Sequence, residues 1–119
     1  MFEALLVVGF VGLLGGGALA WSAFAPDALL VAGLALVATG FAFGIPTGFW
    51  YHVELRRVLL ARGALPVRWW LHPTRLHAAI PRERWWRVMG WCYAGALGWL
   101  VSFVGCCMFA LGAAKLLFT

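Results

Sequence analysis

Charged residues are nearly absent from two long stretches of this sequence, and no other feature constrains the fold as strongly. Between Ala4 and Tyr51 the one charged residue is Asp27, and after Arg87 it is Lys115. Overall, 11% of the residues are charged and 65% are hydrophobic, whereas a soluble domain has about 25% charged and about 45–50% apolar residues. Four acidic and nine basic side chains are too few to coat a soluble globule of 119 residues. The composition disfavours a soluble domain, a disordered chain and a disulfide-rich scaffold, and it indicates an integral membrane protein.

The two apolar stretches are long enough for three membrane-spanning helices. A helix needs about 20 apolar residues to cross a hydrocarbon core of about 30 Å, so the first stretch allows two crossings and the second allows one. We expect spans near residues 4–20, 28–49 and 88–114. Asp27 directly precedes the second span and is a candidate N-cap residue for it. The sequence therefore predicts an all-α, polytopic membrane protein, with residues 1–119 forming a single membrane domain.

The positive charge is concentrated in the segment between the second and third spans. Residues 52–87 contain eight of the nine basic residues, two of the four acidic ones and all three histidines. A short loop rich in arginine faces the cytoplasm in most membrane proteins. We therefore expect this loop and the N-terminus to be cytoplasmic and the C-terminus to lie outside, in the inner (plasma) membrane of a bacterium. Lys115, on the outer side, opposes this orientation, but the eight arginines outweigh it.

The loop is expected to begin as a helical continuation of the second span over residues 52–62. In a helix the apolar side chains of this segment share one face while the charged ones point elsewhere: Leu55, Val58 and Leu59 against Glu54, Arg56 and Arg57. Gly63 is a plausible C-terminal stop, and Pro66 follows it.

Further local expectations concern two prolines and one pair of charges. Pro46 lies inside the second span and predicts a kink, which would be either a hinge or a fixed bend. Pro81 suits the first turn of the third helix. Glu83 and Arg87 are four residues apart with the acid first, which favours an ion pair along that helix.

Glycines at regular spacings predict closely packed helix faces within the membrane. Fifteen glycines are present, and small residues four or seven apart let helix backbones approach one another. The glycines assigned to packing faces are Gly12, Gly16, Gly40, Gly44, Gly48, Gly98, Gly105 and Gly112. These faces could pack against the other two spans, and they could also bind a second polypeptide, either another membrane protein or a second copy of this chain.

Tryptophan and arginine alternate in the loop, as expected at the surface of an inner leaflet. Indole rings favour the headgroup level, and a basic residue near anionic lipid contributes about 1 kcal/mol to binding. The residues assigned to lipid or partner binding are Arg56, Arg57, Arg62, Arg68, Trp69, Trp70, Arg75, Arg82, Arg84, Trp85, Trp86 and Arg87. Nucleic acid could also stack on tryptophan beside arginine. Because the loop is tethered between two spans, lipid or a protein partner is favoured over nucleic acid.

The sequence gives only weak indications of a catalytic, metal-binding or transport site. His52, His72 and His77 are the candidate ligands for a metal, but they lack the four-residue spacing of paired helical ligands and have no cysteine nearby. The three cysteines all lie in the third span, where cysteine usually acts as a small hydrophobic residue. No span has an ionisable group at its centre, which disfavours a transporter. We assign no catalytic residue, no metal and no cofactor.

The preferred function is that of an accessory or assembly subunit of a membrane complex. Its arginine–tryptophan loop would dock on anionic lipid headgroups or on a partner, and the chain would not be an enzyme. The alternative is a lipid-phosphate-binding or metal-dependent membrane enzyme centred on His52, His72 and His77.

Overall fold

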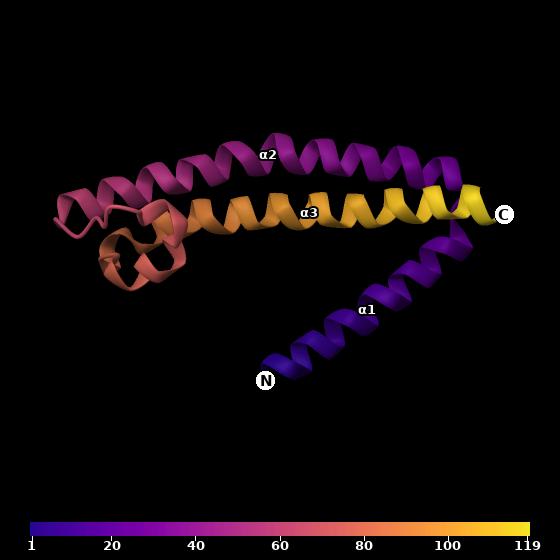
Figure 1. The fold of residues 1–119 in the computed structure, drawn as a ribbon, viewed down its shortest axis with the longest axis horizontal. Coiled ribbons are helices and arrows are strands. Elements are labelled where there is room, and N and C mark those ends of the chain that lie inside the picture. The colour runs from indigo at the N-terminus through magenta and orange to yellow at the C-terminus, as the bar shows by residue number, and fades with distance from the viewer. The chain divides into compact units, whose positions relative to one another are not determined.

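The computed structural model describes residues 1–119 and contains helices but no strand. Three of the helices are long and apolar enough to cross a membrane, which confirms the predicted all-α fold with three candidate spans. In the chain, short 3₁₀ helices connect the second of these long helices to the third (Figure 1). In chain order the elements are α1 (Phe2–Ala23), α2 (Pro26–Ala61), η1 (Trp69–Leu71), η2 (Pro73–Ala79), η3 (Arg82–Arg84) and α3 (Trp85–Phe118).

The chain forms two compact units. The first unit comprises Met1–Thr39 and Val101–Thr119, and the second comprises Gly40–Leu100. Because α2 and α3 each contribute to both units, each unit contains one segment of α2 packed against one segment of α3.

Helices α2 and α3 are longer than a membrane crossing requires. They have 36 and 34 residues, or about 54 Å and about 51 Å at 1.5 Å per residue, against a hydrocarbon core of about 30 Å. The expected spans 28–49 and 88–114 therefore lie within longer helices, and residues 52–61 continue α2 as predicted.

The end of α2 is a Schellman motif built on Gly63. The amide of Ala64 donates to the carbonyl of Leu59 at 3.0 Å, and the amide of Gly63 donates to Leu60 at 3.1 Å. Gly63 has a φ of +63°, in the left-handed region that glycine adopts without steric cost. The sequence-based prediction of a stop at Gly63 is confirmed.

The beginnings of α2 and α3 differ in detail from the expectation. Helix α2 begins at Pro26, so Asp27 lies in its first turn instead of at the N-cap. Proline suits this position because it has no amide hydrogen to leave unpaired, and the Asp27 carboxylate favours the positive end of the helix dipole. Pro81 precedes η3, and α3 begins only at Trp85.

Pro46 lies inside α2 without ending it. Its ring leaves the carbonyl of Ala42 without the usual helical donor. One residue further on, the hydroxyl of Thr47 donates to the carbonyl of Phe43 at 2.8 Å.

In the first unit, glycines bring the backbones of α2 and α3 together. A β-carbon placed on Gly105 would lie 2.7 Å from the carbonyl oxygen of Gly33, and one on Gly112 would lie 2.9 Å from that of Pro26. Both separations are shorter than a side chain tolerates. The Ser102 hydroxyl also donates to the carbonyl of Val37, at 3.4 Å.

Helix α1 is held mainly at its C-terminal end. It contains no buried residue, and β-carbons on Gly12 and Gly16 would meet nothing within 4 Å. At the C-terminal end the Lys115 ammonium donates to the carbonyls of Trp21 and Phe24, at 2.5 and 2.8 Å, and lies 6.0 Å from the centre of a Trp21 ring. Lys115, the basic residue that opposes the predicted orientation, thus provides hydrogen-bond donors for backbone carbonyls at the end of α1.

Candidate functional site

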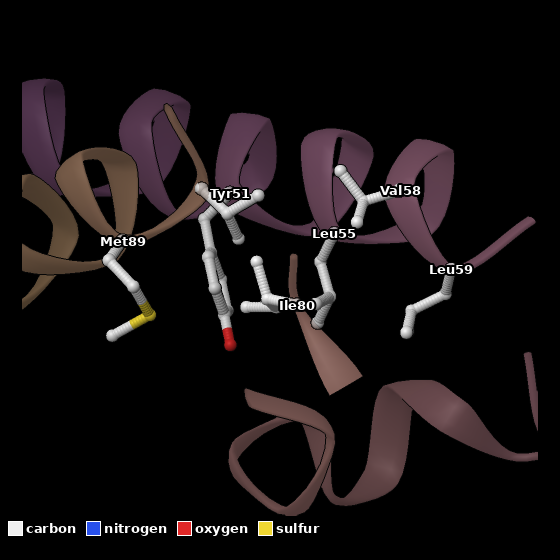
Figure 2. Packing of buried hydrophobic residues seen from close by; sticks show 7 residues of the cluster. Tyr51, Leu55, Val58, Leu59, Ile80 and Met89 are labelled. Carbon is white, nitrogen blue, oxygen red and sulfur yellow. The ribbon is translucent and has the colours of Figure 1, made fainter. Parts of the chain in front are cut away.

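The loop between the spans folds into a cap with its own hydrophobic core. We define the cap as residues 51–89, which cover the end of α2, the three 3₁₀ helices and the first turn of α3. In Figure 2 the side chains of Tyr51 and Leu55 extend from α2 toward the segment that carries Ile80. The buried core residues are Tyr51, Leu55, Val58, Leu59, Ile80, Val88 and Met89. The predicted apolar face of residues 55–59 therefore packs within the protein.

The arginine side chains lie on the outside of this core. All eight arginines between Arg56 and Arg87 are exposed. One of them also stabilises the fold of the cap, because the Arg62 guanidinium donates to the carbonyl of Ala79 at 2.6 Å. The cap therefore has an apolar interior and a strongly basic exterior.

Each tryptophan pair is divided between the interior and the surface. Trp70 and Trp86 are 58% and 74% exposed, whereas Trp69 and Trp85 are partly buried against the core. Adjacent residues of a helical turn point in different directions, so one member of each pair can pack on the core while the other faces outward. The surface role assigned to all four tryptophans therefore suits Trp70 and Trp86, while Trp69 and Trp85 contribute to packing.

A buried carboxylate joins α2 to α3. Glu54 is 3% exposed, and its two oxygens contact Nη1 of Arg57 at 3.1 Å and Nε of Arg87 at 3.3 Å. The expectation that Glu54 points away from the packed face is wrong. Arg87 pairs with Glu54 instead of Glu83, because Glu83 lies in η3, outside the regular turn that would place it four residues before Arg87 on α3.

The histidines form different hydrogen bonds, although the rings of His52 and His77 both pack edge-on against Tyr51. The Tyr51 hydroxyl and Nε2 of His77 are hydrogen-bonded at 2.5 Å. His52 Nδ1 donates to the carbonyl of Gly48 at 2.8 Å, and His72 is exposed. Across residues 1–119 no three His, Cys, Asp or Glu side chains are grouped to hold a metal ion.

A shallow groove on α3 is lined in part by Arg87, one of the two arginines that contact Glu54. Its volume is about 330 Å³, and it is lined by Trp86, Arg87, Gly90, Trp91 and Ala94. Sequence reasoning missed Trp91 and Gly90. The signal was present in the spacing, since positions 86, 90 and 94 form one row of a helix and positions 87 and 91 form the adjacent row.

These features define the class of the chain as an all-α protein with three helices long and apolar enough to cross a membrane. Comparisons with protein-family models, with curated proteins and with solved structures found no match.

Proposed function

We propose that the chain is an accessory or assembly subunit of a membrane complex, with the cap docked on anionic headgroups of the inner leaflet. The observation that carries this proposal is the exposure of all eight arginines around an apolar core. Each arginine would contribute about 1 kcal/mol to the binding free energy near anionic lipid. Trp70 and Trp86, exposed beside them, suit the headgroup region.

Helix α1 supports the role of a subunit. It has 22 residues with no buried side chain, and the faces carrying Gly12 and Gly16 are open. Open small-residue faces allow the close approach of another transmembrane helix. We infer that in the assembled complex this helix packs against a partner or a second copy of the chain.

The proposed orientation places the cap in the cytoplasm of a bacterial cell and the C-terminus outside. It rests on the positive charge of the cap. Val67, at 95% exposure, offers a labelling site. A Val67→Cys variant should react with a membrane-impermeant maleimide in inside-out vesicles and not in right-side-out vesicles, with the unsubstituted protein as the control for its native cysteines. The reverse pattern would overturn the orientation.

Lipid docking is tested by hydrogen exchange of residues 62–84 in nanodiscs. In anionic lipid we expect slower amide exchange than in zwitterionic lipid, and the difference should shrink in high salt because exposed charges are screened. Replacing Arg68, Arg75, Arg82 and Arg84 by Gln should remove the difference. Equal exchange in the two lipids would refute docking.

The accessory role is tested by purification in mild detergent, followed by mass spectrometry of bound proteins, lipids and metals. A stoichiometric partner chain or a homo-oligomer is expected, and monomer alone would contradict this role. The same measurement addresses the alternative of a metal-dependent or lipid-phosphate-binding enzyme. If alanine at His52, His72 and His77 abolished function while assembly persisted, that alternative would replace the accessory role.

A further inference from the structure

Two arginines from different helices are held side by side by one buried carboxylate. Arg57 and Arg87 contact opposite oxygens of Glu54, whose side chain is 4% exposed, while their own side chains are 58% and 60% exposed. A guanidinium has five N–H donors, so each arginine retains donors beyond those facing Glu54. One negative charge between two positive charges leaves a net positive charge. This arrangement suits a phosphate, which binds arginine through several hydrogen bonds at once.

The groove on α3 begins at Arg87 and is otherwise apolar. Trp86 and Trp91 border it, and a β-carbon on Gly90 would meet nothing within 4 Å, so its floor is open. An aliphatic chain could lie there against the indole rings.

Aromatic contacts connect the second arginine to the same groove. The Trp91 ring packs edge-on against Trp50, with centroids 6.3 Å apart. The Arg57 guanidinium carbon lies 5.9 Å from the centre of the Trp50 ring. Both arginines are therefore linked to the groove, Arg87 as a lining residue and Arg57 through Trp50 and Trp91.

We propose that the two arginines and the adjoining groove on α3 form a binding site for one anionic phospholipid, with its phosphate between Arg57 and Arg87 and an acyl chain along the groove. This inference rests on the proposed lipid-facing function and deepens it by naming a specific site. A soluble phosphate would leave the groove empty, and the ammonium group of a zwitterionic lipid would offset the attraction of its phosphate to the arginines. Charge and shape together select an anionic lipid.

The test is native mass spectrometry of the full chain, delipidated in detergent and titrated with phosphatidylglycerol or phosphatidylcholine. The unsubstituted protein should retain one phosphatidylglycerol and bind phosphatidylcholine at least about tenfold more weakly, a difference of about 1.4 kcal/mol. Arg57→Gln, which leaves the Arg87–Glu54 pair in place, should reduce retention about tenfold, as should Arg87→Gln. Gly90→Leu should also reduce it by filling the groove.

Glu83→Gln is the control, since Glu83 is exposed in η3, forms no ion pair and is not among the residues assigned to lipid binding. It should retain phosphatidylglycerol like the unsubstituted protein. Helical circular dichroism should be unchanged in every variant compared. Equal retention by Arg57→Gln and by the control, equal retention of the two lipids, or full displacement by glycerol phosphate would each overturn the site.

The site and the general docking of the cap can fail separately. If Arg57→Gln loses the retained lipid while residues 62–84 exchange equally in anionic and zwitterionic nanodiscs, the site stands and cap docking falls. If exchange slows in anionic lipid but Arg57→Gln retains phosphatidylglycerol, docking stands and the site is refuted.

Discussion

The backbones of Gly44 on α2 and Gly98 on α3 meet so closely that a β-carbon on Gly98 would lie 2.5 Å from the Gly44 Cα. The same β-carbon would lie 2.9 Å from the carbonyl oxygen of Gly40. Both neighbours are backbone atoms, which cannot move aside as the end of a flexible side chain can. Gly98 is therefore required by the packing of the second unit.

Gly98→Ala should lower the free energy of unfolding by about 1–3 kcal/mol, the usual cost of forcing extra volume into a packed interface. The measurement is an SDS titration in mixed micelles followed by circular dichroism. Gly48→Ala is the matched control, because a β-carbon on Gly48 meets nothing within 4 Å. The control should be neutral or up to about 1 kcal/mol more stable, since alanine favours helix over glycine. Similar losses in both variants would contradict the packing argument.

The contrast between Gly44 and Gly48 shows how far sequence reasoning reaches. The four-residue spacing identified both as members of one helix face, and the backbones of both lie against glycines of α3, Gly98 and Gly95. The spacing did not identify where an added β-carbon would collide: one on Gly44 would lie 3.2 Å from the Gly98 Cα, whereas one on Gly48 would meet nothing within 4 Å. That depends on the axial register of two helices, which the spacing of one helix does not contain. Gly33 and Gly95, which also lie at close approaches, were missed for the same reason.

Sequence reasoning succeeded where the determinants are local. The positive φ of Gly63 and the length of apolar segments depend on neighbouring residues, so the end of α2 and the three candidate spans were predictable. The burial of Glu54 was not, because its partner Arg87 is 33 positions away in the sequence and comes close only when the cap folds. The shared helix face of Leu55, Val58 and Leu59 alone led to the expectation that Glu54 points elsewhere.

Lys115→Met should loosen the end of α1, because it removes the donor to the carbonyls of Trp21 and Phe24. Hydrogen bonds from a charged donor contribute about 1.5–3 kcal/mol each when both partners are well ordered. We expect amide exchange in residues 20–27 to become at least about tenfold faster. Thr119→Ala is the control, since the Thr119 hydroxyl donates only to the Lys115 carbonyl. Unchanged exchange in Lys115→Met would show that the contacts do not hold α1.

Glu54→Gln should destabilise the second unit, because it leaves Arg57 and Arg87 beside a neutral group. Breaking a fully buried ion pair costs about 3–5 kcal/mol, but both arginines are more than half exposed and can be hydrated. We therefore expect a loss of about 1–2 kcal/mol in the same SDS titration. Glu83→Gln serves for comparison, since Glu83 is exposed in η3. This substitution should lower the free energy of unfolding by less than about 0.5 kcal/mol. A larger loss for Glu83→Gln would indicate the pair along α3 that the sequence suggested.

The hydrogen bond between Tyr51 and His77 ties η2 to α2. Tyr51→Phe should lower the free energy of unfolding by about 1 kcal/mol, the usual net value of such a hydrogen bond. His77→Ala should lower it further, because this change leaves the part-buried Tyr51 hydroxyl without this partner and opens space beside Trp85. The double variant should be less destabilised than the sum of the two, with a coupling of about 0.5–1.5 kcal/mol, because the residues are in direct contact. His72→Ala, at an exposed position, should change stability by less than about 0.5 kcal/mol and should show no coupling to Tyr51→Phe. Additive effects of Tyr51→Phe and His77→Ala would mean that the bond contributes nothing to the fold of the cap.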